Sequence, residues 1–340
     1  MPVGSLSLIE TGQILPELAD EMPCLRTLSE KTEELLENLR GLGSRPDEFV
    51  KVEALLSAFK PVTEAIDVAF CNNPKVLGKI REGFRRNSAD VFLKSKLFRA
   101  VRTWQEGYPA DYLTMEMIYA NLPHDAGGGA PCHLDKYFHS RLLSRAIRSR
   151  LSKLSGLLQA RLKEETGKSN WLALACGPCR ELLALPRKKN LTINATDYDP
   201  NFIPYAKYLL ESESKVADCV RLQKANAMSF LSAKRNLSEY GLFTTIYSPG
   251  VFDYLDDNAL TMLIPGLYKS LAPGGLLILP FKDSTRYELF DYHWLAKWNS
   301  FFQRTADFAV SLVNRSGISA DQITVEREET GAILFIVVRK

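Results

Sequence analysis

Two short stretches carry residues whose types and spacing could do chemistry. Leu172–Leu183 (LALACGPCRELL) joins an apolar run to a small-residue turn, and Thr192–Asp199 (TINATDYD) is a second apolar run that ends in acid. In a parallel sheet, a glycine turn after one strand and a carboxylate after the next lie at the same edge, where they can grip a ribose. We therefore predict strand, turn and helix over the first stretch, and a ribose-binding carboxylate at Asp197.

The first turn is poorly suited to a dinucleotide. It has one central glycine, Gly177, and lacks the G-x-G-x-x-G spacing that lets a backbone approach a pyrophosphate. S-adenosylmethionine carries a ribose and no phosphate, so it fits this turn better. We assign to this cofactor the residues Ala175, Cys176, Gly177 and Pro178, and we expect Tyr198 to lie on its adenine face. Asp199 precedes Pro200 and is expected to cap the following helix instead.

Two later strand ends carry further polar residues. Asn226 follows the third predicted strand and is expected to hydrogen-bond the adenine edge, with a backbone N–H from Ala227 beside it. The stretch YSPGVFDY follows the fourth strand, where ligands bind in open α/β sheets. From this stretch we assign Tyr247, Ser248 and Gly250 to the cofactor.

The cysteines of the first turn allow a rival interpretation. Cys176 and Cys179 form a Cys-x-x-Cys pair at a strand-to-helix junction, as in thiol oxidoreductases. The pair lies midway along a 340-residue chain rather than near the start of a small domain. The carboxylate at Asp197 has no role in thiol exchange, so redox chemistry is the weaker alternative. A zinc site that adds Cys132 and His133 is weaker still, because the turn is already occupied, and we predict no metal.

From residue 170 onward, strand patterns alternate with helical ones. This alternation is typical of a parallel sheet covered on both faces. The last two strands are separated only by Glu328–Gly331, which predicts an antiparallel hairpin. The fold class is therefore α/β, with a Rossmann-like, seven-stranded, mostly parallel sheet and a C-terminal antiparallel hairpin. Leu271–Gly275 (LAPGG) is expected to end a helix and turn into the fifth strand. The predicted strands are Trp171–Ala175, Thr192–Thr196, Val220–Gln223, Phe243–Tyr247, Leu276–Pro280, Ile323–Arg327 and Ala332–Val338.

The N-terminal part is predicted to be an all-helical domain, because apolar residues recur at spacings of three and four from about residue 21 to 105. We expect residues 1–133 to form a helical cap or substrate domain and residues 134–340 the cofactor domain, with 134–168 as a linking helix. Leu134–Glu165 is predicted as one long helix with an arginine stripe at Arg141, Arg145 and Arg148. Ala126–Ala130 (AGGGA) is expected to be a loop.

Composition excludes several classes of function. The net charge of +3 over 340 residues is too small to argue for nucleic-acid binding. No apolar run reaches the length of about 18 residues expected of a membrane span, and the N-terminus lacks the regions of a secretory signal. The six scattered cysteines favour reduced thiols and a cytoplasmic location. Oligomeric state and pathway are left open.

In their order along residues 170–340, these motifs resemble those of class I S-adenosylmethionine-dependent methyltransferases. The chain departs from the usual pattern at Cys179, where a second glycine is common, at Asn226, where an acid is usual, and at Thr244, where aspartate is frequent. Over about residues 100–285, GYPADYLTMEMIY and DKYFHSRLLSRAIRSR extend the resemblance to the bacterial methyltransferases named for making 3-hydroxy fatty acid methyl ester signals. The resemblance implies methyl transfer to a fatty-acid carboxylate, with S-adenosyl-L-homocysteine as product.

The acceptor decides which further residues matter. An ionised carboxylate needs a cation to orient it and no general base, and the candidates in falling order are Arg148, Arg145, Tyr112, His139 and Tyr287. A hydroxyl or amine acceptor would need a base, His139 or Asp253. Arg286–Trp298 is aromatic and is either a further wall of the acceptor pocket or core. The alternatives are another small-molecule acceptor, a macromolecular one, and a non-enzymatic sensor that binds the same cofactor.

Overall fold

The computed structural model describes residues 22–124 and 127–340 and divides the chain into two compact units. The helical unit comprises the residues up to Arg141 together with Glu288–Asn299, and the sheet unit comprises Leu142–Tyr287 and Ser300–Lys340. The chain therefore passes between the units three times. The division into a helical cap or substrate domain over 1–133 and a cofactor domain over 134–340 stays a prediction.

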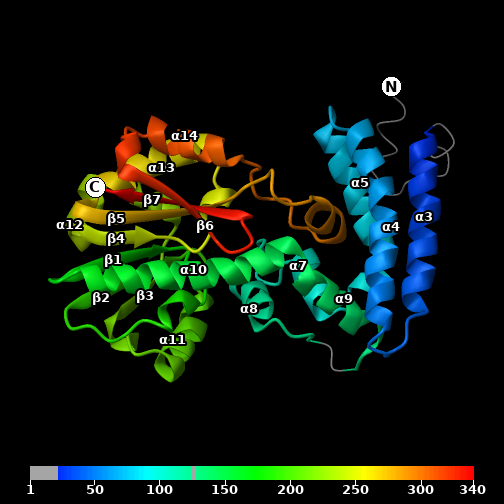
Figure 1. Cartoon of the computed structure of the whole chain (residues 1–340), viewed down its shortest axis with the longest axis horizontal. Coiled ribbons are helices and arrows are strands. Elements are labelled where there is room, and N and C mark those ends of the chain that lie inside the picture. The colour runs from blue at the N-terminus through cyan, green and yellow to red at the C-terminus, as the bar shows by residue number, and fades with distance from the viewer. Residues whose placement is uncertain (1–21, 125–126) are drawn as a thin grey trace. The chain divides into compact units, whose positions relative to one another are not determined.

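The sheet unit contains the predicted seven-stranded sheet, in the order β3-β2-β1-β4-β5-β7-β6 (Figure 1). Strands β1 to β5 pair in parallel, whereas β7 pairs antiparallel with both β5 and β6. The predicted fold class is confirmed, including the terminal hairpin. The strands are β1 (Ser169–Leu174), β2 (Leu191–Asp197), β3 (Val220–Lys224), β4 (Phe243–Tyr247), β5 (Leu271–Lys282), β6 (Ile323–Arg327) and β7 (Ile333–Arg339).

Strand β5 begins earlier than predicted, so the expectation that Leu271–Gly275 is only a turn is wrong. Leu271 already pairs with Phe243, and regular pairing resumes at Leu276, opposite Thr245. The residues between them form an irregularity in the strand, which Gly274 permits with a φ of 71°.

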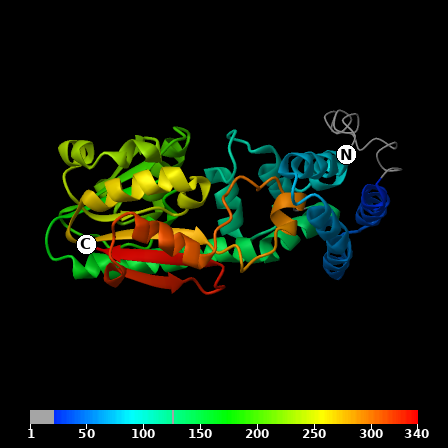
Figure 2. The ribbon, with the colours of Figure 1, turned by 90° about the horizontal axis from the view of Figure 1, so that it is seen from above.

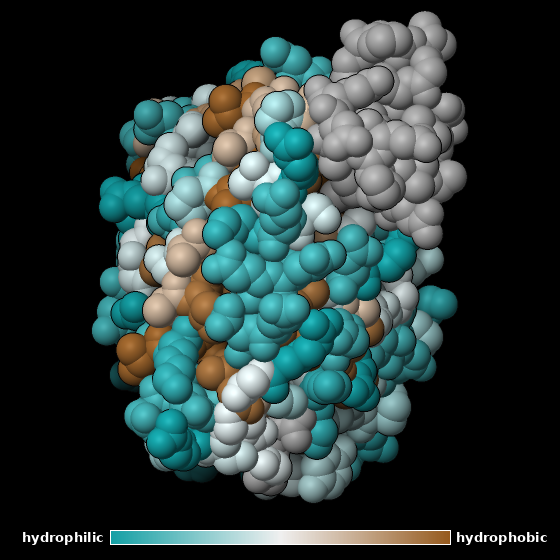
Figure 3. Space-filling view, turned by 90° about the vertical axis from the view of Figure 1, so that its right-hand side faces the viewer, coloured by the Kyte–Doolittle hydropathy of each residue, from teal (hydrophilic) through white to brown (hydrophobic). Residues whose placement is uncertain are grey.

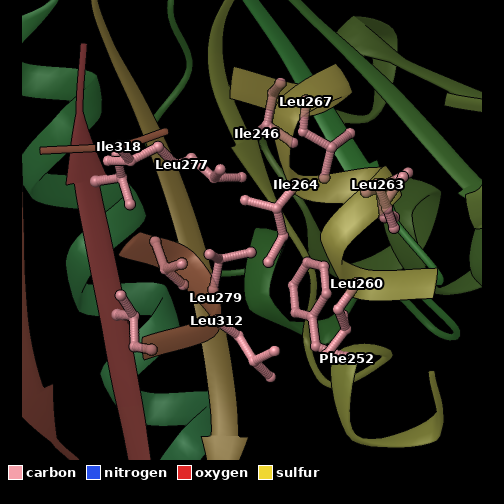
Figure 4. Packing of buried hydrophobic residues seen from close by; sticks show 14 of the residues in the cluster. Ile246, Phe252, Leu260, Leu263, Ile264, Leu267, Leu277, Leu279, Leu312 and Ile318 are labelled. Carbon is pink, nitrogen blue, oxygen red and sulfur yellow. The ribbon is translucent and has the colours of Figure 1, made fainter. Parts of the chain in front are cut away.

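Helices cover both faces of the sheet (Figure 2). Alternate residues of β1, β4, β5 and β7 point to one face and pack against α13 and α14. Figure 4 shows Leu277 and Leu279 of β5 on this face, with Ile264 of α13 and Leu312 of α14 in the same cluster. Helix α10 lies along the other face, α11 packs beside β3, and α12 precedes β4. The helices are α10 (Leu142–Glu164), α11 (Phe202–Glu213), α12 (Ala233–Tyr240), α13 (Asp257–Lys269) and α14 (Ala306–Arg315).

A buried arginine fixes α10 against the sheet. Arg161, which is 8% exposed, pairs with Glu165 at 2.9 Å and donates to the Thr245 hydroxyl at 3.3 Å. It also donates to the carbonyls of Thr244 and Gly274, each at 3.1 Å. Because a buried charge is costly without partners, these contacts hold the C-terminal half of α10 beside the start of β4.

Two predicted helices differ from the structure. The long helix Leu134–Glu165 is two helices, because Arg141 is extended (φ −67°, ψ 150°) and separates α9 from α10. The helix predicted after the first turn is absent, and only the short 3-10 helix η1 (Arg180–Leu182) is present. Pro186 disfavours α conformation in the preceding residue, so too few residues remain here for a stable helix.

The described residues of the helical unit form seven α-helices and the short π-helix η5. Helix α3 is amphipathic, and the side of the unit on which it lies is covered mostly by hydrophilic side chains (Figure 3). Ala126 of the predicted AGGGA loop lies outside the described residues, and Gly129 already begins α9. The helices are α3 (Pro23–Arg40), α4 (Glu48–Ala69), α5 (Pro74–Asn87), α6 (Ala89–Phe92), α7 (Lys96–Thr103), α8 (Tyr112–Ala120) and α9 (Gly129–Ser140).

Within the aromatic segment 286–298, residues 288–298 contribute core to the helical unit. Its short π-helix η5 (Phe290–Leu295) is buried throughout. The Trp294 ring lies 5.8 Å from the Phe84 ring, and its indole N–H donates to Asp67 at 3.0 Å. Arg102 donates to the Leu295 carbonyl at 2.6 Å. A segment late in the sequence thus completes a core built mainly by early helices.

We expect Trp294→Ala to destabilise the helical unit by about 3–5 kcal/mol, because it opens a large cavity and leaves Asp67 without its indole donor. Urea denaturation combined with hydrogen exchange of α5 and α7 measures this loss. Leu122→Ala is the matched control, because Leu122 belongs to the same unit and is 65% exposed. A loss for Trp294→Ala as small as that for the control would show that η5 is dispensable.

Candidate functional site at the carboxyl edge of the sheet unit

The turn after β1 is held in an unusual backbone conformation. Ala175, Gly177 and Cys179 have φ values of 47°, 51° and 58°, in the left-handed region that glycine tolerates best. Two of these three residues carry a Cβ, so the turn stores strain of about 1–2 kcal/mol for each of the two. Within this turn the Cys176 amide donates to the Thr196 carbonyl at 3.1 Å, and the Cys179 amide donates to the Cys176 carbonyl at 3.2 Å.

Asp197 ties this turn to the end of β2. Its Oδ2 accepts from the Gly177 amide at 3.0 Å, and its Oδ1 accepts from the Asp199 amide at 3.1 Å. Burial is the largest influence on this carboxyl and raises its pKa, although the amides oppose that shift. A carboxylate has about four acceptor positions, so Asp197 keeps capacity for two ligand hydroxyls.

The neighbouring strand ends supply an exposed ring and an amide. The Tyr198 side chain is 67% exposed, and Lys224 Nζ lies 6.0 Å from its ring centroid. Asn226 caps η3 (Ala227–Leu231), because its Oδ1 accepts from the Met228 amide at 2.9 Å. Only the Asn226 Nδ2 donors are then available to a ligand.

The α11 terminus differs from the expectation for Asp199. The N-cap residue of α11 is Asn201, which makes no side-chain cap. Asp199 Oδ1 instead accepts from the Asn201 amide at 2.8 Å, which closes a turn one step before the helix.

The turn after β4 is closed by a buried serine. Ser248 Oγ accepts from the amides of Gly250 and Val251 at 3.1 and 3.0 Å. Tyr247 is fully buried, and its hydroxyl donates to Glu181 Oε1 at 3.0 Å. The assigned roles of Tyr247 and Ser248 are therefore restricted to their backbone atoms in this conformation.

Glu181 is a buried residue that the sequence did not single out. It lies in η1, directly after the first turn, and is 1% exposed. Burial raises its pKa to about 7, against the opposing effects of backbone amides, Tyr247 and Arg150. The sequence does contain one signal for Glu181, because this acid follows Cys179 by two residues in a segment predicted to pack as a helix.

The cysteines of the turn are poorly suited to thiol chemistry. Cys176 and Cys179 are 2% and 0% exposed, and all six cysteines of the chain are free. Burial raises the pKa of Cys176 well above its ordinary value. The contact with Cys176 lowers the pKa of Cys179, but burial and the nearby carboxylates outweigh it, so this pKa is raised too. Reactive thiols are exposed and have depressed pKa values, so the geometry disfavours the redox alternative.

The five candidate acceptor residues are divided between the units. Arg145 and Arg148 lie on α10 of the sheet unit, exposed and half-buried respectively. Tyr287, also of the sheet unit, donates its hydroxyl to Gln303 at 2.7 Å. Tyr112 and His139 belong to the helical unit, where the His139 Nε2–H donates to the Leu122 carbonyl at 3.1 Å. Their joint role stays a prediction.

The second candidate base, Asp253, is engaged in a buried ion pair. Its Oδ2 accepts from Lys282 Nζ at 2.7 Å, and its Oδ1 accepts from the Lys282 amide at 3.1 Å. Both side chains are 2% exposed. In this conformation Asp253 cannot accept a substrate proton without leaving Lys282 buried and unpaired.

Two negative findings concern the described part of the chain. No cluster of three or more His, Cys, Asp or Glu side chains there could hold a metal ion. None of its helices combines the length and apolarity needed to cross a bilayer.

No protein-family model matches this chain, and no curated protein does. Among solved structures, a possible exported protein from Bordetella parapertussis is 21% identical, with a TM-score of 0.58 over 76% of this chain and 88% of that one. The N-methyltransferase NodS from Bradyrhizobium japonicum WM9 is 19% identical, with a TM-score of 0.37 over 57% and 95%. Magnesium protoporphyrin IX methyltransferase (ChlM) from Synechocystis PCC 6803, with bound SAH, is 11% identical, with a TM-score of 0.45 over 58% and 87%. At these identities the likeness concerns the fold.

We expect Ala175→Gly to leave stability unchanged or to raise it by up to about 1 kcal/mol, because relief of the left-handed strain offsets the added chain entropy. Ala173→Gly, in the extended and buried middle of β1, is the control and should lose about 1 kcal/mol. Thermal denaturation of both variants measures the difference. Equal losses would show that the turn is unstrained.

The raised pKa of Glu181 makes stability depend on pH. Its value of about 7 lies above the ordinary 4.5, so its contribution is complete below pH 4.5 and is lost as pH rises through 7. The cost at pH 8.5 is on the order of 3 kcal/mol. Glu181→Gln keeps a partner for Tyr247 and removes the charge.

We therefore expect Glu181→Gln to raise the Tm more at pH 8.5 than at pH 5. Glu329→Gln, which changes an exposed glutamate of the same unit, should shift the Tm little at either pH. A Glu181→Gln effect that is equal at both pH values would contradict the raised pKa.

Proposed function

We propose that this protein is an S-adenosylmethionine-dependent methyltransferase that acts on a small molecule. The observation that carries the proposal is Asp197, a carboxylate at the tip of β2 that holds the Gly177 amide and keeps acceptor capacity for ribose hydroxyls. The strand order and the terminal hairpin provide the open parallel edge at which nucleosides bind in such sheets.

The residues of this edge fit the cofactor in character. The turn Ala175–Pro178 holds no cation for a phosphate, and its Cys176 and Gly177 amides are bonded to the end of β2. The exposed Tyr198 ring can lie against adenine. The Asn226 Nδ2 donors and the backbone N–H of Ala227 are the proposed contacts to the adenine edge, since the Asn226 Oδ1 is engaged as the cap of η3. Gly250 and the backbone of Tyr247 and Ser248 complete the edge. When bound, the cofactor supplies a methyl group that its sulfonium has already activated.

We further propose a carboxylate acceptor, such as a hydroxy fatty acid. An ionised carboxylate needs no general base, which agrees with the engagement of Asp253 by Lys282. The protein then has only to bind, align and exclude water from the two reactants. Arg148 and Arg145 are the proposed cations, with Tyr112, His139 and Tyr287 as further acceptor contacts.

Titration calorimetry of wild type and Asp197→Asn with S-adenosylmethionine and S-adenosylhomocysteine tests the cofactor. Asparagine keeps an acceptor for the Gly177 amide but loses the charge, so we expect affinity to fall roughly 10- to 100-fold. Asp218→Asn is the control, because Asp218 is an exposed aspartate whose partner is the exposed Arg187. Failure of wild type to bind either nucleoside would contradict the proposal.

Transfer of a radiolabelled methyl group to a panel of acceptors tests the substrate class. We expect 3-hydroxy acids of medium and long chain to be methylated, and their methyl esters to be inert because the carboxylate is already blocked. Methylation of only amines, alcohols or a macromolecule would retain the cofactor and overturn the carboxylate assignment.

A further inference from the structure

We propose that Arg150 is an anion-binding residue of the carboxyl edge, and that its ligand is a carboxylate. The inference rests on the proposed function only for the identity of the molecule that carries this carboxylate. Arg150 lies outside the predicted arginine stripe of Arg141, Arg145 and Arg148 on the same segment.

Arg150 is a buried arginine that the described residues leave without a hydrogen-bond or ion-pair partner. It is 6% exposed, and within the described part of the chain its guanidinium makes no hydrogen bond and no ion pair. Arginine normally satisfies its five donors when it is buried, since an unpaired buried charge is costly. None of its nitrogens is both sealed from solvent and unpartnered, so the guanidinium opens onto accessible space.

The turn after β4 is shaped around this guanidinium. A Cβ built on Gly250 would lie 2.3 Å from Arg150 Nη1 and 3.2 Å from its Cζ, which is closer than atoms can approach. A larger residue at this position would therefore displace the Arg150 guanidinium from the end of β4. The Ser248 hydroxyl accepts a hydrogen bond from the Gly250 amide at 3.1 Å, which holds Gly250 in place beside the guanidinium.

Helix geometry explains why Arg150 reaches this edge. Arg150 and Arg161 are eleven residues apart, which is three turns of helix, so both project from the sheet-facing side of α10. Arg161 bonds to Thr244 and Thr245 at the start of β4, and Arg150 meets Gly250 just beyond its end. The first arginine anchors the helix, and the second is carried to the edge where ligands bind in parallel sheets.

The charges around Arg150 leave it without a full counter-ion. Lys282 lies near enough for Arg150 to lower its pKa, but the partner of Lys282 is Asp253. The other acid near Arg150 is Glu181, whose pKa the positive charge of Arg150 lowers. Burial outweighs this effect and raises that pKa to about 7, and Glu181 lies beyond ion-pair distance from Arg150. An incoming anion would therefore complete the local charge balance.

A carboxylate fits better than a phosphate. A single guanidinium pairs with a carboxylate through two parallel hydrogen bonds, whereas the nearby Glu181 and Asp253 would repel a doubly charged group. Two molecules of the proposed reaction can supply the carboxylate, namely the methionine part of the cofactor and the acceptor. The chemistry is the same, so the experiment must separate them.

Calorimetry of wild type and Arg150→Gln with two nucleosides separates the sources. S-adenosylhomocysteine carries the amino-acid carboxylate, and 5′-methylthioadenosine lacks it. If Arg150 holds the cofactor, the variant should bind S-adenosylhomocysteine roughly 10- to 100-fold more weakly and methylthioadenosine as wild type does. If it holds the acceptor, both affinities should be unchanged and binding of 3-hydroxydecanoate should weaken by a similar factor.

Two further variants guard against a merely structural effect. Lys163→Gln removes an exposed charge from the same helix and should change none of these affinities. Gly250→Ala keeps the arginine but displaces its guanidinium, and should reproduce the selective loss of Arg150→Gln. Equal weakening of both nucleosides and of 3-hydroxydecanoate, or no change in any of them, would overturn the proposal.

A spectroscopic probe tests Arg150 even if the proposed function fails. The Arg150 Nε–Hε resonance is identified in the NMR spectrum of wild type by its absence from Arg150→Gln. A saturable shift of this resonance with S-adenosylhomocysteine or 3-hydroxydecanoate, but not with methylthioadenosine, supports a carboxylate site. If wild type binds neither nucleoside, the methyltransferase proposal fails, and the response to 3-hydroxydecanoate alone decides the role of Arg150.

Discussion

The hydrogen bond from the Gly177 amide to the Asp197 carboxylate is the contact on which the candidate site depends. It joins the turn after β1 to the tip of β2, two points that are separated by twenty residues in sequence and adjacent only through strand pairing. The turn reaches Asp197 because three of its residues adopt left-handed backbone conformations, two of them at a steric cost. The strained turn thus holds one buried acid in a fixed position at the carboxyl edge of the sheet.

A second constraint is the placement of charge on α10. The helix buries two arginines on one side, and the sheet satisfies them differently. Arg161 pairs with Glu165 and donates to the Thr245 hydroxyl and to the carbonyls of Thr244 and Gly274, near the start of β4. Arg150 lies against Gly250, beyond the carboxyl end of β4. Ligands bind at the carboxyl ends of parallel strands. Arg150, the arginine for which the described residues supply no partner, lies at that edge. The same reasoning makes the fully paired Asp253–Lys282 a supporting element rather than a reactive one.

The helical unit shows that the division into units does not follow the order of the sequence. Residues 288–299 leave the sheet unit after β5, bury η5 among the early helices, and return before α14. The bonds of Arg102 to Leu295 and of Tyr137 to Asp291 belong to this core, the latter at 2.6 Å. A change in the C-terminal half can therefore act on the stability of the N-terminal helices, through burial of aromatic surface and not through the candidate site.

Local patterns in the sequence determined the strands, the hairpin and the edge at which the candidate site lies. Alternation of strand and helix implies a parallel sheet, and the short connection Glu328–Gly331 forces an antiparallel end, so the fold class followed from periodicity and turn chemistry. The Gly177 turn and the acid at Asp197 were visible for the same reason, since both are set by residues next to a strand end. Tertiary structure decided what periodicity cannot encode. It replaced the helix after the first turn by η1, broke the long helix at Arg141, and drew η5 into a distant core. It also separated Arg150 from its neighbouring arginines, because burial of a charged side chain depends on which glycine, carbonyl or acid the folded chain brings to it.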